Sequence, residues 1–248
     1  VNYNRDIEIF PVVESMLEMI SGKSIYKSPT DMGVNMAGNC IVDDDACCKA
    51  SKCEIIRRYY KCLCEQRING FAKDDLYKLE LLMNQAGIST SYRQVVTKAS
   101  ERSARTDGHP AVAIELPDGT VVTGKTGDLL GASASALLNA LKELAGIDHE
   151  LDLVSATSIA PIQKLKTDYL GSHNPRLHTD EILIALSTSA ADNELAARAL
   201  EQLPKLNGCD AHSTVILSSV DDKMFKRLGI QLTCEPKYEE EERLYHKS

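Results

Sequence analysis

The stretch Asp118-Gly119-Thr120-Val121-Val122-Thr123-Gly124-Lys125-Thr126-Gly127-Asp128 decides how the second half of the chain folds. It contains G-x-x-x-x-G-K-T, the pattern of a P-loop, whose backbone N–H groups surround a phosphate and whose Lys-Thr begins a helix. The four residues between its glycines, however, are all β-branched, which favours an extended backbone. Before them, the apolar run 111–115 leads into Leu116-Pro117-Asp118-Gly119, which is typical of a tight turn. The pattern therefore predicts a β-hairpin at 110–124, and an ATP-binding P-loop from Gly119 to Thr126 is the alternative.

Length and composition indicate an ordinary globular protein. The chain has 248 residues, 43% of them hydrophobic, and a net charge of −8, so one large or two modest domains are expected. The acidic balance argues against nucleic-acid binding, and no apolar run reaches membrane-spanning length. Because the chain begins at Val1 and shows no signal peptide, we expect a fragment or processed product of a cytoplasmic protein.

The cysteines do not form a metal-binding pattern. Six of the eight fall between Cys40 and Cys64, but no C-x-x-C pair occurs among them. Zinc sites generally need such spacing, so reduced thiols are the simpler interpretation. We expect neither a metal nor a cofactor.

Hydrophobic periodicity predicts an α/β protein with two domains. Helices are expected at 12–20, 43–66, 73–85 and 92–102, which gives a helical subdomain over residues 1–105. The turn-rich run 106–110 marks the boundary. A three-layer α/β domain with a mixed sheet follows over 106–248. Its predicted elements are the hairpin, helices at 129–144, 159–169, 179–190, 193–203 and 221–228, and strands at 151–155, 212–217 and 230–234.

Three strings resemble a bacterial family of unknown function, some of whose members carry the label of ATP-dependent peptidase. They are the residues 26–35, 161–166 and 173–181, and the resemblance extends over essentially the whole chain. It implies that the chain is the C-terminal half of a longer protein whose N-terminal domain is missing. It implies no established activity.

The order hairpin–helix–strand–helix–strand–helix–strand resembles the cytidine-deaminase-like fold. Deaminases carry zinc ligands and a catalytic Glu at the start of the helix after the hairpin and on the next helix. The matching positions here are Ser133-Ala134-Ser135 and 161–165, which hold neither ligand nor acid. The resemblance therefore implies a zinc-free member of this fold, in which a small-molecule site in the same cleft remains open.

In that fold, several polar segments would converge: the loop after the hairpin, the helix start with Ser133 and Ser135, and the start of the next helix near Thr157-Ser158. Helix N-termini, hydroxyls and a Lys form a reasonable anion pocket, while an Arg can clamp a phosphate or carboxylate. Buried packing explains Ser133 equally simply, and a turn before a helix capped by Thr179 explains 173–180. Catalytic roles are predicted for Lys125, His173 and His178, and ligand contacts for Asp31, Asn35, Thr126, Ser133, Asn174 and Arg176.

Three functional hypotheses follow from these patterns. The first is a protein, with or without enzymatic activity, that binds a small anionic or nucleotide-like ligand. The second is an ATP-using P-loop protein with Lys125 on the phosphates. The third is a non-catalytic assembly or interaction half of the longer protein, for which homo-oligomers and the missing N-terminal domain are the expected partners.

Overall fold

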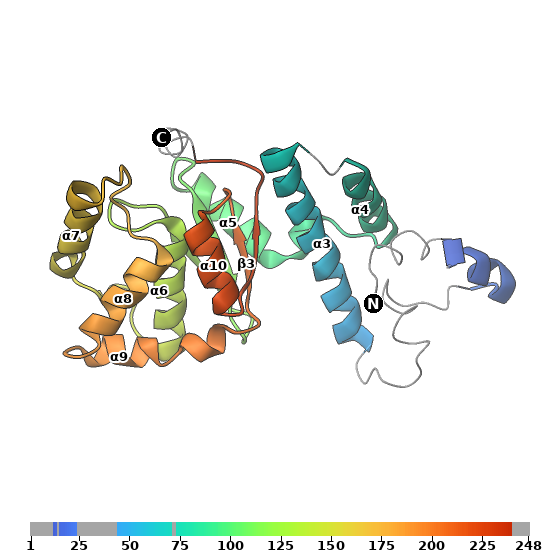
Figure 1. The fold of residues 1–248 in the computed structure, drawn as a ribbon. Helices are drawn as coiled ribbons and strands as arrows, with labels where there is room; N and C mark the ends of the chain where they lie inside the picture. Colours follow the sequence, from blue (N-terminus) through green and yellow to red (C-terminus); the bar gives the residue numbers. More distant parts are fainter. Residues whose placement is uncertain (1–11, 14, 24–43, 71–72, 240–248) are drawn as a thin grey trace. The chain divides into compact units, whose positions relative to one another are not determined.

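A computed structural model describes residues 12–13, 15–23, 44–70 and 73–239 (Figure 1). The chain divides into two compact units, Val1–Arg93 and Gln94–Ser248. In the described part, no helix has both the length and the apolar character needed to cross a membrane.

The first unit is helical wherever it is described. Residues 12–13 and 15–21 are helical. Two longer helices, α3 (Asp44–Asn69) and α4 (Lys73–Gln85), pack against each other, and the 3₁₀ turn η2 (Thr90–Tyr92) follows. Ile55, Ile56 and Tyr60 of α3 are buried, as are Leu79 and Leu82 of α4. The helical character predicted for this part of the chain is therefore present.

The second unit begins with helix α5 (Gln94–Ala104), ahead of the predicted boundary at 105/106. The helix is amphipathic and buries Val95, Val96 and Ala99. It packs against the strands of the sheet that follows it in the chain. The segment therefore contributes a layer to the α/β unit.

The Walker-like string forms a hairpin. Strands β1 (Ala111–Glu115) and β2 (Val121–Lys125) pair antiparallel, with Val112 opposite Gly124. The turn closes with a 2.9 Å bond from Gly119 N–H to the Leu116 carbonyl, and Gly119 takes the left-handed φ of 86° that favours glycine. The predicted hairpin is confirmed. The P-loop alternative is wrong, because its β-branched residues are extended and no helix begins at Lys125-Thr126.

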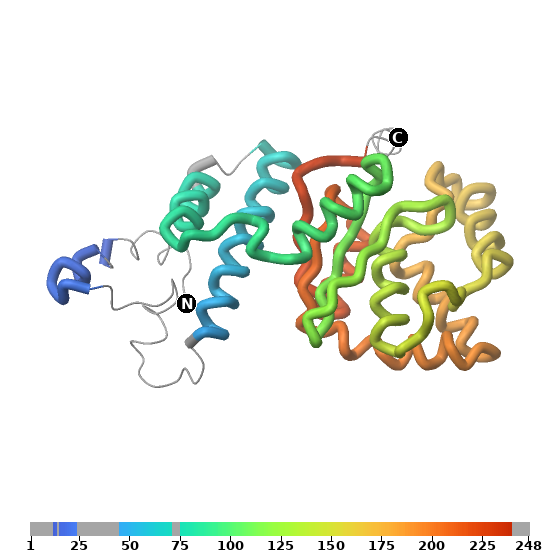
Figure 2. The backbone as a smooth tube through the Cα atoms, turned by 180° about the vertical axis from the view of Figure 1, so that it is seen from behind, coloured from blue at the N-terminus to red at the C-terminus, as the bar shows by residue number. Residues whose placement is uncertain are grey.

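The sheet is mixed and has four strands in the order β2-β1-β3-β4 (Figures 1 and 2). Strand β3 (Asp210–Ser213) is antiparallel to β1, and β4 (Gln231–Cys234) is parallel to β3. Helix α10 (Ser219–Arg227) forms the crossover between β3 and β4. Strand β3 ends before the predicted residue 217, because the Ser213 hydroxyl bonds to the backbone of Val215 and turns the chain away.

Helices cover both faces of the sheet. Val112 and Ile114 belong to the main hydrophobic cluster together with side chains of α6 (Ala132–Ala145), whereas Ala111 and Ala113, although buried, do not. Successive side chains of a strand point to opposite faces. The cluster therefore fills one face, and α5 covers the other, where it packs against β1, β2 and β3.

Helix α6 lies unusually close to β2. A Cβ atom on Gly124 would meet the backbone of Ala136 and would lie 2.6 Å from the Ser135 carbonyl carbon. The helix contributes Ala132, Ser133, Ala134 and Ala136 to the buried side of this contact. The second glycine of the Walker-like string is thus explained by packing.

Four helices and a 3₁₀ turn connect α6 to β3. These are α7 (Ala156–Lys164), the π-helical turn η3 (Leu165–Tyr169), α8 (Thr179–Ser189), α9 (Glu194–Leu200) and η4 (Leu203–Leu206). The strand predicted at 151–155 is wrong. Leu153 and Val154 enter the core without a partner strand, and Ser155 already caps α7 by accepting a bond from the Ser158 N–H.

Candidate anion-binding site

A narrow pocket of about 30 Å³ lies where β2 and β3 end and α6 begins. The loop before α8 and the first turn of α10 complete its wall. Five of the predicted site residues come together in it: Thr126, Ser133, Asn174, Arg176 and His178.

Other predicted site residues lie elsewhere. Lys125 is exposed at the end of β2, and neither it nor His173 lines the pocket. The start of α7 is also absent from its lining, so the predicted convergence of Thr157 and Ser158 on this place is wrong. Asp31 and Asn35 fall outside the described residues.

Backbone bonds fasten the loop before α8 to the loop before α6. Leu130 and Leu177 form an isolated parallel bridge, in which the Leu177 N–H donates to the Leu129 carbonyl at 2.9 Å. Gly131 N–H donates to the Leu177 carbonyl at 3.2 Å. This bridge holds Arg176 and His178 beside the N-terminus of α6.

A buried Lys holds the same loop from within. Lys166, in the π-helical turn, donates from Nζ to the Arg176 carbonyl at 2.6 Å and to Glu181 Oε2 at 2.8 Å. Glu181 Oε2 also accepts from the His178 N–H at 2.8 Å. These contacts make His178 the N-cap of α8, one residue before the predicted Thr179 cap.

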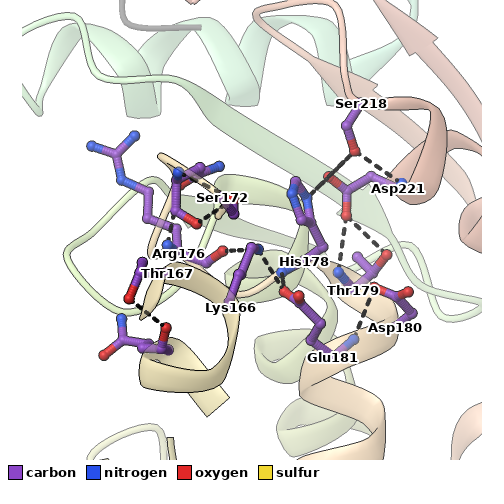
Figure 3. A network of polar contacts seen from close by, with 12 residues as sticks. Lys166, Thr167, Ser172, Arg176, His178, Thr179, Asp180, Glu181, Ser218 and Asp221 are labelled. Atoms are coloured by element: carbon purple, nitrogen blue, oxygen red, sulfur yellow. Dashed lines mark hydrogen bonds and ion pairs between the residues drawn. The ribbon is translucent and has the colours of Figure 1, made fainter. Parts of the chain in front are cut away.

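His178 is paired with a buried carboxylate. Its Nδ1 lies 3.0 Å from Asp221 Oδ2, and Figure 3 shows the ring turned toward Asp221 and Ser218. Asp221 is 4% exposed and accepts further bonds from the Thr179 N–H, the Thr179 hydroxyl and the Ser218 hydroxyl, each at 2.9 Å. The carboxylate thereby fixes the ring by its Nδ1 and leaves Nε2 for another partner.

This pairing shifts both titrations. The hydrogen bond and charge of Asp221 raise the pKa of His178 above its ordinary value, against the opposing effect of burial. Burial alone would raise the pKa of Asp221, but the hydrogen bond and charge of His178, together with the Thr179 and Ser218 bonds, hold it below its ordinary value. The pair therefore favours an imidazolium beside a carboxylate.

We predict that this ion pair makes stability depend on pH. A raised His pKa stabilises the fold fully below its ordinary value of 6.5, and that contribution is lost as pH rises through the folded pKa. A lowered Asp pKa stabilises it above 3.8, and that contribution is lost as pH falls through the folded pKa. The ion pair therefore stabilises the fold most between pH 3.8 and pH 6.5, the ordinary pKa values of the two groups. Lys166 weakens and Glu181 strengthens the shift of the His178 pKa.

The measurement is urea unfolding of the parent and His178→Gln between pH 5.5 and 9. The free-energy gap between them should shrink as pH rises over that range, since the stabilisation from the raised pKa of His178 is lost as the imidazole deprotonates. His109→Gln, at an exposed histidine, should give a curve parallel to that of the parent. A constant gap for His178→Gln would contradict the ion pair.

Two residues with hydroxyl side chains line the pocket beside the start of α6. Ser133 is 2% exposed and Thr126 is 5% exposed, and both line the pocket. The ladder of α6 begins with Ser135 N–H bonded to the Gly131 carbonyl, so the first N–H groups of the helix have no partner in that ladder. The two hydroxyl side chains and the N-terminus of α6 thus border the same small space.

Arg176 brings a guanidinium to the pocket. The Asn174 side chain accepts from the Arg176 N–H at 3.1 Å and shapes the turn. Figure 3 shows the guanidinium turned away from the Lys166–Glu181 pair, and its Nη1 meets Glu239 Oε1 at 3.0 Å. Each cation of the pocket thus has an acidic neighbour: Asp221 for His178 and Glu239 for Arg176.

The sequence prediction missed Ser218, Asp221 and Glu239. Ser218 and Asp221 form the Ser-x-x-Asp pattern of a helix start, and Ser218 indeed caps α10. That signal locates a helix, but it does not reveal the histidine to which Asp221 is paired. Glu239 lies in a charged tail whose sequence carries no site pattern.

Comparisons with known proteins assign the chain to a family. Residues 91–245 match the model described as "Domain of unknown function DUF1846, C-terminal", and residues 1–87 match that described as "Domain of unknown function DUF1846, N-terminal". The chain thus matches the N-terminal model as well as the C-terminal one, whereas we expected it to correspond only to the C-terminal half of a longer protein.

Curated relatives give the same result. The chain is 56% identical to a UPF0371 protein of Corynebacterium glutamicum (strain R) over 238 residues, which are 96% of this chain and 48% of that protein. It is 52% identical to a UPF0371 protein of Streptococcus pneumoniae (strain JJA) over 247 residues, which are 100% of this chain and 50% of that protein. The chain spans about half the length of these relatives. Because the C-terminal model alone matches more than half of it, the chain belongs to the DUF1846 family, a bacterial family of unknown function.

Proposed function

We propose that the protein binds the terminal phosphate or carboxylate group of a small molecule in the pocket at the start of α6. The observation that carries this proposal is the meeting of two hydroxyl side chains, Ser133 and Thr126, with the N-terminus of α6 in one small pocket that Arg176 and His178 also line. A helix N-terminus with hydroxyls beside it is a general means of binding anions. Arg176 and protonated His178 supply the positive charge.

The size of the pocket limits what enters it. A volume of about 30 Å³ suits a single small group, since about 10–15 Å³ on this measure holds one water molecule. The rest of the ligand remains outside. His178 serves as the proton donor to the bound group, because Asp221 holds its Nδ1 and leaves Nε2 available. Proton transfer to the ligand is the enzymatic form of this proposal.

The deaminase-like topology belongs to the same proposal. The hairpin, α6, β3, α10 and β4 follow one another in the expected order, although the strand at 151–155 is not formed. The pocket also lies at the start of the helix after the hairpin, where the resemblance places a cleft. These features support a zinc-free, deaminase-like domain that follows a helical subdomain.

The test is thermal unfolding with increasing inorganic phosphate, and with acetate as a carboxylate probe. Saturation at a hundred times Kd adds about 2.7 kcal/mol, a shift of roughly 5–11 °C for a protein of this size. Phosphate also stabilises proteins without binding them, by exclusion from their surface. The relevant result is therefore the difference between the parent and Ser133→Ala or Arg176→Ala, both of which should lose the specific part of the shift.

Lys125→Ala is the matched control, since it removes an exposed cation outside the pocket and should shift as the parent does. Equal shifts in all four proteins would refute the anion pocket. Together with a stable dimer, that result would favour the non-catalytic assembly hypothesis. Mg-ATP, tested in parallel, should raise the unfolding temperature no more than phosphate does.

A further inference from the structure

A second, wider cavity adjoins the anion pocket. It has a volume of about 670 Å³ and is lined by the end of α5, by residues 107–110 and by the segment 235–239. We call it the wide groove. Its lining and that of the pocket share Pro110, Val215 and Glu239. The volume is that of a site for a drug-sized molecule.

Glu239 lies where the two cavities meet. Its side chain is 16% exposed, and its Oε1 lies 3.0 Å from Nη1 of Arg176, which lines the pocket and is absent from the lining of the groove. The carboxylate therefore reaches a pocket cation from the groove side. Glu239 thus makes the same contact with Arg176 that the carboxylate or phosphate of a bound ligand would make.

The segment that carries Glu239 is anchored on the sheet. Glu235 N–H donates to the Ser213 carbonyl at 2.9 Å, and Ile216 N–H donates to the Lys237 carbonyl at 2.7 Å. These bonds place the chain beside the ends of β3 and β4 and bring Glu239 to the rim of the pocket. The backbone anchors at Glu235 and Lys237 do not involve the Glu239 side chain.

The two acids of the pocket differ in how they are held. Asp221 is 4% exposed and is bound by the Thr179 backbone and by two hydroxyls, so its carboxylate is part of the wall. Glu239 approaches from the segment after the last strand and faces the groove. Of the two carboxylates, Glu239 is the one that an entering anion meets on Arg176.

We infer that Glu239 is an internal counter-ion that occupies Arg176 in place of the ligand, and that the ligand carries a terminal phosphate or carboxylate which displaces Glu239 as it enters from the wide groove. This inference rests on the proposed anion pocket. It assigns the wide groove to the body of the ligand, and it makes Glu239 a determinant of affinity. Removing the carboxylate charge should take away one competing anion at Arg176 and strengthen anion binding.

The experiment is calorimetric titration of the whole chain with inorganic phosphate. Glu239→Gln keeps the size of the side chain and removes its charge, and it should bind phosphate about tenfold more tightly than the parent, as loss of one competing, partly buried ion pair implies. Glu201→Gln is the matched control, because it makes the same change at an exposed carboxylate outside the linings of both cavities, and it should leave the affinity within about twofold of the parent. In an Arg176→Ala background, Glu239→Gln should give no gain.

The outcomes separate the two proposals. Binding by the parent with equal or weaker binding by Glu239→Gln would overturn the counter-ion and leave the anion pocket in place. A tenfold gain that persists without Arg176 would also overturn it, since the repulsion would then not act through that guanidinium. Absence of binding in both the parent and Glu239→Gln would refute the anion pocket itself. Binding by Glu239→Gln alone would support both.

Discussion

Gly124→Ala should destabilise the protein by about 3 kcal/mol or more, the largest effect that we expect from a single methyl group in this chain. The added Cβ would collide with the backbone of Ala136 and would lie 2.6 Å from the Ser135 carbonyl carbon. A helix backbone cannot move aside as a side-chain tip can, so β2 and α6 must separate. Their contact helps to form the main hydrophobic cluster. Urea unfolding should show a fall in midpoint, and a thermal scan a loss of roughly 6–12 °C.

Gly127→Ala is the control for this experiment. It lies in the same Gly-Lys-Thr-Gly run, but a Cβ there would meet no atom within 4 Å. The free energy of unfolding of this variant should stay within about 0.5 kcal/mol of that of the parent. If Gly124→Ala were as stable as Gly127→Ala, the close approach of β2 to α6 would be refuted.

Asp221→Ala should cost about 3 kcal/mol, because it leaves a cluster of donors without their acceptor. The Thr179 N–H, the hydroxyls of Thr179 and Ser218, and Nδ1 of His178 all meet this carboxylate, which is 4% exposed. Without the Asp221 carboxylate the pKa of His178 should fall, since the hydrogen bond and charge of Asp221 are the main causes of the upward shift. Denaturant unfolding measures the first effect, and NMR titration of the imidazole measures the second.

The neighbouring acid offers a matched control. Asp222 is also in the first turn of α10, but its side chain is 40% exposed and pairs with Lys226 on the helix surface. Asp222→Ala should therefore cost about 0.5 kcal/mol or less and should leave the His178 titration unchanged. Equal losses for the two variants would mean that the buried network around Asp221 contributes little.

The elements that the sequence predicts well are those whose signals are local. The hairpin follows from its β-branched run and its Pro-Asp-Gly turn, and α4 from its periodicity, with both bounds matched. The strand at 151–155 fails for a non-local reason. Leu153 and Val154 are apolar enough for a strand, but they pack into the hydrophobic core and do not pair with another strand. Local propensity does not determine whether such a segment pairs with a strand or only packs into the core.

The same distinction holds for the site. Thr126 and Ser133 could be placed because they flank elements that local patterns reveal, the end of the hairpin and the start of α6. The partner of His178 could not be found in this way. Asp221 lies 43 residues away, and the two side chains meet only after α8 and α10 have packed together. Lys125 was predicted from the Walker-like pattern, and the strand leaves its side chain exposed outside the pocket lining.

The bridge between Leu130 and Leu177 has a consequence for the order in which the protein folds. Joining these two loops closes a long chain segment, which costs entropy that only the completed packing of α7 and α8 recovers. A partly folded chain that already contains the hairpin and α6 therefore lacks the wall formed by the loop before α8. Binding of the proposed ligand should thus report the fully folded domain, and a ligand added during refolding should act on the last, non-local steps of folding.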